Sequence, residues 1–349
     1  MKIRYSVQVI KAPVWVVITT INPPVPRITD FLQLGWQIVI VADRKTPQND
    51  WESFANEGLH FFSLEDQSQK YPLLSKLIGE NTYARKNLGY LFALEFGAQT
   101  IFDTDDDTFF RTSAIELLNN IAEFRNWNVT GEGWFNPYIL FCPNTGLWPR
   151  GYPINLVSAD RWHLNPKLNI DSNSMYQPPD IIQTLINLEP DVDSIYRMTV
   201  SDEVINFPIS NDLYHVEWPV VSPANTQSTF WIKRSSFEYL YIPATVSFRF
   251  MDILKMFIAQ SRHRLAYAGF LSDQFRNPHD YMKDFESEIS CFLNTSKVVS
   301  ILQGSEDSPL QYIYELLEKE KICETEEIQI FSAFNSEVSR IENQRLAQF

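Results

Sequence analysis

The sequence predicts an α/β fold with a mostly parallel central sheet, and three observations lead to that prediction. Short apolar runs that suit buried strands alternate with helical patterns over the first third of the chain. Polar residues follow directly on several of these runs, as they do at the carboxyl ends of parallel strands. Hydrophobic residues make up 44% of the 349 residues and charged residues 21%, so an ordinary core can form. Together these features are typical of a Rossmann-like sheet flanked by helices.

The expected elements follow in chain order. Apolar runs predict four strands, at residues 14–18, 36–41, 59–62 and 100–102. Apolar residues at helical spacing predict a helix over 83–96 that stops at Gly97, and Ser113 opens a further helix with a capping box. Residues 130–250 are irregular and rich in proline, and we interpret the apolar run at 181–188 as a helix. Later helices are expected at 249–262, at 281–293, from Ser308 onward and at 324–346.

Charge and cysteine content exclude several classes of protein. The formal net charge of −14 repels nucleic acid and anionic membranes. Cys142, Cys291 and Cys323 lie far apart without a CxxC pair, which argues against a disulfide scaffold and fits a reducing compartment. The apolar run at 14–18 is too short for a signal peptide, and no other stretch is long enough to cross a bilayer. We therefore expect a soluble cytoplasmic protein, and a homo-oligomer is compatible with this composition.

The acidic run from Asp103 to Asp107 is the strongest local signal. It holds four carboxylates directly after an apolar strand. Carboxylates this close repel one another unless a positive charge lies between them. Mn²⁺ and Mg²⁺ take oxygen ligands and share them with phosphates, and such a metal also activates a leaving nucleotide. The run therefore predicts a metal and nucleotide site, with a solvated acidic turn or a calcium loop as the alternative.

Other polar residues are expected to join this site. Asn22 lies in a loop after the first strand and Asp43 ends the second strand, so both should meet the acidic run at the carboxyl edge of the sheet. Arg85 and Lys86 are adjacent cations near a helix N-terminus, where phosphate binding is favoured. An ordinary exposed helix face is the alternative for these two cations.

Short segments between residues 14 and 290 match known proteins in the same order. They are Thr20–Pro24, Lys45–Pro47, Arg85–Tyr90, Ile101–Asp107, Asn136–Tyr138, Trp148–Pro153, Pro190–Ser194 and Asn277–His279. With these segments the chain resembles the STELLO family of glycosyltransferases. More distantly it is similar to the reversibly glycosylated polypeptides, which include UDP-arabinopyranose mutases.

The resemblance implies a GT-A fold, a nucleotide-sugar donor with a UDP-sugar favoured, a hydroxyl acceptor such as a glycan, and a divalent metal. It places residues 1–300 in a GT-A-like domain, with a nucleotide-binding half at 1–125 and a sugar and acceptor half at 126–300. Residues 301–349 are then a helical appendage. The nucleotide-sugar-binding residues it implies are Thr20, Asn22, Asp43, Lys45, Arg85, Lys86, Asp103, Asp105 and Arg150.

The resemblance also implies the metal ligands. Asp105, Asp106 and Asp107 match the DDD triplet of the glycosylated polypeptides, whereas plant STELLO proteins carry Asp-Ala-Asp-Asp there, so which two carboxylates bind the metal stays open. GT-A enzymes often bring a late histidine to the metal, which makes His279 a candidate beside a purely structural role. Arg150 matches the arginine that the glycosylated polypeptides modify with sugar. Chemically it suits a clamp on a diphosphate or a sugar hydroxyl equally well, or a structural role.

Three carboxylates are candidate catalytic groups. Asp191 and Asp193 are spaced to grip sugar hydroxyls, with a solvated turn as the alternative. Asp252 lies on an apolar helix, where a carboxylate is costly unless it is paired or functional. GT-A enzymes often keep an acidic residue near the acceptor at such a place. Arg249, three residues earlier, is its expected partner, and a plain ion pair is the alternative.

Three functions follow from these residues. The first is transfer of a sugar from a nucleotide diphosphate to an acceptor hydroxyl, in glycan or polysaccharide synthesis. The second is a UDP-sugar mutase or self-glycosylating protein, and the third is a non-catalytic scaffold with a GT-A fold. The intact acidic run argues against the scaffold, because clustered carboxylates are costly to keep without a function. We therefore expect a metal-dependent glycosyltransferase.

Overall fold

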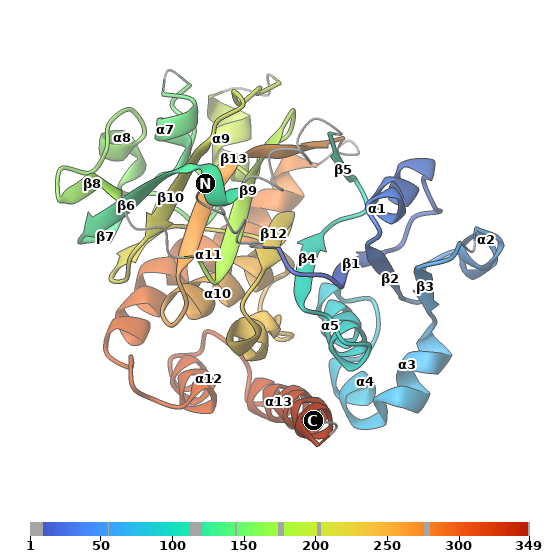
Figure 1. Ribbon diagram of the computed structural model, residues 1–349. Helices are drawn as coiled ribbons and strands as arrows, with labels where there is room; N and C mark the ends of the chain where they lie inside the picture. The colour runs from blue at the N-terminus through green and yellow to red at the C-terminus, as the bar shows by residue number, and fades with distance from the viewer. Residues whose placement is uncertain are drawn as a thin grey trace.

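The computed structural model describes residues 10–54, 56–111, 121–143, 145–173, 178–200, 204–275 and 280–347. It confirms the predicted α/β architecture, because a large mixed sheet forms the centre of the molecule and helices pack around it (Figure 1). The helix start expected at Ser113 lies outside the described residues. The three cysteines are free thiols. None of the helices in the described part of the chain has the length and apolar character needed to cross a bilayer.

Eleven strands of the described residues form one sheet, in the order β3-β2-β1-β4-β12-β9-β13-β10-β6-β8, with β5 beside β13. Two short strands, β7 and β11, pair separately. The strand bounds are β1 Val14–Thr20, β2 Gln37–Ala42, β3 Leu59–Phe62, β4 Thr100–Thr104, β5 Thr108–Phe110, β6 Arg125–Gly131, β7 Gly133–Trp134, β8 Leu168–Asn173, β9 Ile181–Asn187, β10 Asp212–Val216, β11 Val220–Val221, β12 Ser228–Trp231 and β13 Leu265–Gln274.

The helices fill the connections between strands and the end of the chain. Their bounds are α1 Asp30–Gln33, α2 Gln48–Ser53, α3 Leu64–Lys70, α4 Pro72–Ile78, α5 Lys86–Glu95, α7 Tyr138–Phe141, α8 Val157–Asp160, α9 Ser194–Thr199, α10 Phe248–Gln260, α11 Tyr281–Gln303, α12 Leu310–Lys319 and α13 Glu326–Leu346. Short 3₁₀ helices are η1 Pro26–Thr29, η2 Tyr83–Arg85, η3 Ile121–Glu123 and η4 Arg234–Leu240.

The four strands predicted in the first third are confirmed and form the parallel block β3-β2-β1-β4. Along β1, Val17 packs in the core on one face of the sheet and Val16 in the core on the other, which is why the strand is continuously apolar. Helix α5 crosses close above β1 and β2 at Gly89, where a Cβ atom would come within 2.4 Å of Val41. Because strand order reverses beside β1, the carboxyl ends of β1, β2 and β4 meet at a ligand-binding edge.

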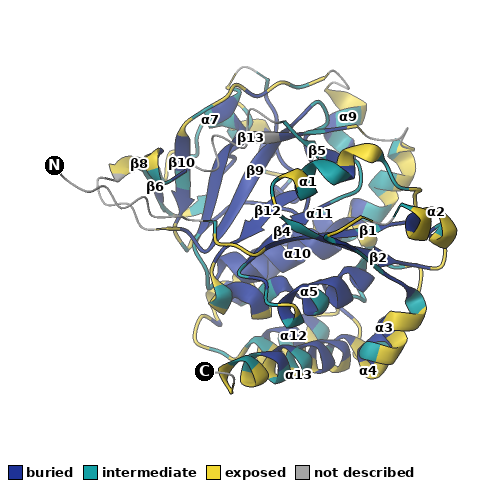
Figure 2. Ribbon diagram, turned by 45° about the vertical axis from the view of Figure 1, so that its right-hand side comes forward, coloured by how far each residue is buried: buried dark blue, intermediate teal, exposed yellow. Residues whose placement is uncertain are grey.

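The helix predicted over 181–188 is wrong, because this segment is the central strand β9. Every residue of β9 is buried between β12 and β13, and Figure 2 shows this part of the sheet as buried throughout. Gln183 and Thr184 are buried as well, and both bond to neighbouring backbone or side chains. The apolar residues of β9 at 181, 182, 185 and 186 are separated by Gln183 and Thr184, which is the spacing of one helix face.

The last three helices, α11, α12 and α13, pack against the same hydrophobic core as the sheet. Helix α11 packs against α10, and α13 lies along α4 and α5 of the parallel block (Figure 1). Glu327, in the first turn of α13, is fully buried. Its carboxylate accepts hydrogen bonds from the Tyr241 hydroxyl and from the backbone N–H groups of Ala244 and Thr245, at 3.0 Å and 2.7 Å for the latter two. Helix α13 therefore fixes the segment that leads into α10.

We expect Glu327→Gln to lower the free energy of unfolding by about 2 kcal/mol or more, since hydrogen bonds to a charged acceptor are lost and an amide NH₂ faces the donors. Urea unfolding followed by circular dichroism measures the change. Glu326→Gln is the matched control, because Glu326 is the exposed neighbour in the same helical turn. Equal stability of the two variants would contradict a fixing role for Glu327.

Candidate active site

A pocket of about 370 Å³ opens where β1, β2 and β4 end. This volume lies in the range of small-molecule sites. A second cavity of about 20 Å³ lies deeper, behind Arg150, and has room for about one water molecule. The pocket at the strand ends, called the larger pocket in contrast to this cavity, is the candidate site because the predicted residues converge on it. Of the predicted residues it brings together Thr20, Asn22, Asp43, Lys45, Asp105, Asp106, Asp107, Arg150 and Asp252.

The loop after β1 holds one carboxylate of the acidic run. The Thr20 hydroxyl donates a hydrogen bond to Asp106 Oδ2, and Asn22 Nδ2 donates to the same oxygen at 2.8 Å. The loop is itself anchored, because Trp51 Nε1 donates to the Asn22 carbonyl at 2.9 Å. Two neutral donors thus fix Asp106 toward the β1 side of the pocket.

The end of β2 supplies a second fixed carboxylate and a free cation. Asp43 is buried and accepts hydrogen bonds from the backbone N–H groups of Arg44, Asn81 and Thr82 at 2.6, 2.8 and 3.0 Å. Asp43 therefore ties β2 to the loop before η2. Lys45 is exposed at the pocket rim and is, within the described residues, the one pocket-lining cation without a carboxylate partner.

Asp103 lies beneath the pocket, in a buried ion-pair network. Its oxygens contact Lys86 Nζ and Lys255 Nζ, both at 2.8 Å, and it accepts a hydrogen bond from the Tyr90 hydroxyl at 2.6 Å. Burial opposes ionisation of Asp103, but the two lysines outweigh it and hold the carboxyl pKa below its ordinary value. Burial lowers the pKa of Lys255 to about 8, against the attraction of Asp103. Asp103 thus supports the acidic run from below and does not line the pocket.

Asp105 and Asp107 present carboxylates to the pocket. Asp105 Oδ1 accepts from the Tyr83 hydroxyl at 2.9 Å and from Lys86 Nζ at 3.2 Å. Burial raises the pKa of Asp105, although Lys86 and the Tyr83 hydroxyl oppose the rise. Asp107 accepts from Gln274 Nε2, at 3.1 and 3.2 Å from its two oxygens.

The predicted metal ligands form an open donor set. In the described ranges, no three Asp, Glu, His or Cys side chains converge on one point as a metal cage. Mg²⁺ is commonly bound through one or two carboxylates together with substrate phosphates and water. The partly buried carboxylates of Asp105, Asp106 and Asp107 are hard oxygen donors that fit a metal of this kind. His279 lies outside the described residues.

The structure does not bring Arg85 to the pocket. Its side chain is buried and donates to Gln67 Oε1 at 2.9 Å, to Ser75 at 3.2 Å and to the carbonyl of Gly79. The 3₁₀ turn η2 directs Arg85 beneath α3 and α4, so the exposed helix face considered from the sequence does not exist. Lys86 is also fully buried, and its contact with Asp105 is its link to the pocket.

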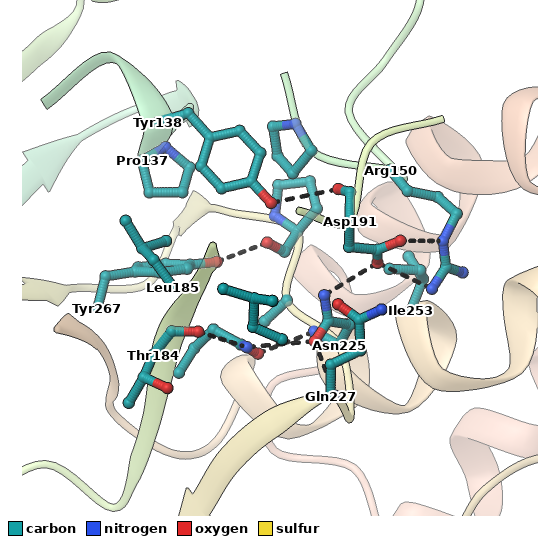
Figure 3. A pocket seen from close by; sticks show the side chains of 15 residues that line it. Pro137, Tyr138, Arg150, Thr184, Leu185, Asp191, Asn225, Gln227, Ile253 and Tyr267 are labelled. Carbon is teal, nitrogen blue, oxygen red and sulfur yellow. Dashed lines mark hydrogen bonds and ion pairs between the residues drawn. The ribbon is translucent and has the colours of Figure 1, made fainter. Parts of the chain in front are cut away.

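Arg150 joins two of the predicted catalytic carboxylates. It is buried, and its Nη1 and Nη2 donate to the two oxygens of Asp252 at 2.9 and 2.7 Å. Its Nε and Nη2 donate to the two oxygens of Asp191, both at 2.9 Å. Figure 3 shows Arg150 and Asn225 both directed at Asp191, beside the small cavity. Asp191 therefore lies behind Arg150, and Asp252 alone of the predicted catalytic carboxylates lines the larger pocket.

The expected Arg249–Asp252 pair is wrong. Arg249 Nε and Nη2 donate to Glu288 Oε1 on α11, at 2.9 and 2.7 Å. Asp193 is also outside the pocket, because it caps the N-terminus of α9. It accepts from Tyr196 N at 2.8 Å and from Trp148 Nε1 at 2.6 Å, and burial raises its pKa to about 7.

Sequence reasoning missed several residues that line the pocket. Tyr83 contacts Asp105 and Gln274 contacts Asp107, while Phe248 is an exposed aromatic side chain at the start of α10. Tyr83 stands two residues before Arg85, so its place just ahead of the matched segment was a usable signal. Nothing in the sequence distinguishes Phe248 from the other phenylalanines of the chain.

Comparison with known proteins shows which proteins this chain resembles. No family model matches the chain. Over 310 residues, 82% of this chain and 39% of the relative, it is 26% identical to the probable glycosyltransferase STELLO2 of Arabidopsis thaliana. The chain is similar to the STELLO proteins. It is also 28% identical over 264 residues to the probable glycosyltransferase STELLO1 of the same plant, across 70% of this chain and 33% of that protein. The STELLO resemblance is thereby confirmed, and the chain spans between 33% and 39% of the length of these curated relatives.

Proposed function

We propose that the chain is a metal-dependent glycosyltransferase that moves a sugar from a nucleotide diphosphate sugar, with a UDP-sugar favoured, to an acceptor hydroxyl. One observation carries the proposal: a single pocket places the acidic run between the strand ends at Asp43 and Lys45 and the carboxylate of Asp252. The two relatives are named probable glycosyltransferases, which supports the same reaction class. Glycan or polysaccharide synthesis is the process we infer for it.

The donor is assigned to the side of the parallel block. Lys45 is placed to meet a phosphate at the pocket rim, and Asn22 offers polar atoms near the nucleoside. Asp105 and Asp107, with Asp106 beside them, would hold Mn²⁺ or Mg²⁺ together with the diphosphate. Such a metal, when bound, would neutralise charge that develops on the leaving nucleotide.

The acceptor hydroxyl is assigned to Asp252. In an inverting transfer, the hydroxyl oxygen bonds to the anomeric carbon as the bond from that carbon to the phosphate oxygen breaks, and Asp252 takes the hydroxyl proton. Each carboxylate oxygen keeps a second lone pair for this contact beside its hydrogen bond to Arg150. Arg150, held from behind by Asp191, fixes the orientation of the Asp252 carboxylate.

The geometry favours the structural role of Arg150, as the group that orients Asp252, over both a clamp on the donor and a sugar-modified residue. Its nitrogens are directed at two carboxylates and at the carbonyl of Arg249, within a buried network. A self-glycosylating arginine would have to present a nitrogen to the donor sugar. A mutase would return a rearranged UDP-sugar without an acceptor, so product analysis after incubation with UDP-sugars separates it from a transferase.

We expect UDP binding to require a divalent cation, because a diphosphate beside several carboxylates is repelled without one. Calorimetric titration with UDP should give an affinity weakened by roughly tenfold or more in EDTA compared with Mn²⁺. Adding excess Mn²⁺ back to the EDTA-treated protein should restore binding, which controls for damage to the fold. Equal affinity with and without metal would contradict the metal part of the proposal.

A further inference from the structure

Phe248 is an exposed aromatic side chain in the wall of the pocket. It is 60% exposed although it begins the otherwise buried helix α10. An exposed phenylalanine loses the stabilisation that burial of its ring would give. An apolar surface exposed in a concave pocket, among polar groups, indicates contact with a ligand.

Polar groups surround the Phe248 ring in an arrangement that suits a sugar. Asp252 lies one helical turn later on the same face of α10, and it accepts hydrogen bonds. Arg249 uses Nε and Nη2 on Glu288, and within the described residues its Nη1 has no partner and can donate. A pyranose ring has one apolar C–H face and a rim of hydroxyls that donate and accept. A lipid would instead need a continuous apolar groove.

Tyr83 connects Phe248 with the acidic run. The Tyr83 hydroxyl bonds to Asp105, and the Tyr83 ring meets the Phe248 ring edge-to-face at 5.7 Å. Tyr83 thus bonds to the acidic run through its hydroxyl and contacts Phe248 through its ring. We assign a ring stacked on Phe248 to the acceptor side because Asp252 lies on the same helix.

We propose that Phe248, Arg249 and Asp252 form a subsite for a pyranose ring of the acceptor, so that the acceptor is a glycan and not a peptide hydroxyl. This inference rests on the proposed function for the assignment of donor and acceptor sides. The aromatic face binds the C–H face of the ring, and Asp252 and Arg249 bind its hydroxyls.

The test is saturation-transfer NMR with methyl β-D-glucopyranoside, methyl β-D-galactopyranoside and N-acetylserine amide, each with UDP and Mn²⁺ present. We expect a glycoside to bind through the protons of one ring face, with a dissociation constant raised about tenfold in Phe248→Ala and near wild type in Phe248→Trp. Phe96→Ala is the matched control, because Phe96 is 53% exposed outside the pocket. Calorimetry with UDP on the same variants should show unchanged donor affinity.

The possible results separate the two ideas. The subsite is overturned if Phe248→Ala leaves glycoside binding unchanged, or if only the serine amide binds. In either case, binding of UDP leaves the proposed function standing. Loss of UDP affinity in Phe248→Ala assigns the ring to the donor and overturns the acceptor subsite. Glycoside binding that depends on Phe248 in a protein that binds no nucleotide supports the subsite and contradicts the transferase.

Discussion

Asp252→Asn should lower turnover by roughly 10²–10⁴ while the affinity for the donor stays near wild type. The amide keeps the shape of the side chain and cannot take a proton from the acceptor hydroxyl. Asp252 is the one predicted catalytic carboxylate that lines the larger pocket within the described residues, which is why the largest kinetic effect is assigned to it. Release of UDP from a bound UDP-sugar measures turnover, and calorimetry measures donor affinity.

Two further variants test whether that result reflects loss of the base. Asp212→Asn is the matched control, since Asp212 is paired with Arg125 outside the pocket and should leave turnover unchanged. Asp252→Glu keeps the charge but moves it, and should recover part of the rate. Wild-type turnover in Asp252→Asn would contradict the base role and indicate a retaining mechanism, because Asp191 and Asp193 do not line the pocket. Loss of donor binding, or a fall in turnover that unfolding alone explains, would leave Asp252 with only its structural role as the partner of Arg150.

Arg150→Met should lower the free energy of unfolding by about 3–5 kcal/mol, the cost of leaving buried charges unpaired. Arg150 is the single cation that contacts both Asp191 and Asp252 in the described structure, and the side chains of these carboxylates are 2% and 10% exposed. Urea denaturation measures the loss.

The charge origin of that loss can be tested directly. The triple variant Arg150→Met, Asp191→Asn, Asp252→Asn removes the unpaired charges and should recover much of the stability. Arg150→Lys should be intermediate, because an ammonium group cannot make two bidentate contacts. If Arg150→Met alone is as stable as the wild type, the buried carboxylates of Asp191 and Asp252 do not depend on the guanidinium for stability.

The sequence predicted the parallel block well and the second half of the sheet poorly, for a physical reason. β1 is an uninterrupted apolar run followed by polar residues, whereas the apolar run of β9 is interrupted by Gln183 and Thr184, which gives it the spacing of a helix face. The acidic run was recognisable because four carboxylates in five residues demand compensation.

The partners of charged residues could not be predicted, because they are distant in sequence. Arg150 pairs with Asp191 and Asp252, 41 and 102 residues away, and Arg249 pairs with Glu288, 39 residues away. Local spacing suggested Arg249 for Asp252, and only the packing of α11 on α10 rules it out. The direction in which the η2 turn points Arg85 likewise depends on tertiary structure.

The backbone ladder between β4 and β12 has a mechanical consequence. Thr104 and Asp103 beneath the pocket pair with Ser228 and Thr229, so β2, which precedes Lys45, and β13, which follows the helix of Asp252, belong to one hydrogen-bonded sheet. Hinge closure between these two parts of the sheet would break that ladder, which makes rigid-body domain closure too costly to accompany each turnover. Substrate entry and product release are then left to movements of loops and side chains at the pocket mouth. Ligand-free and UDP-bound protein should therefore have nearly the same radius of gyration.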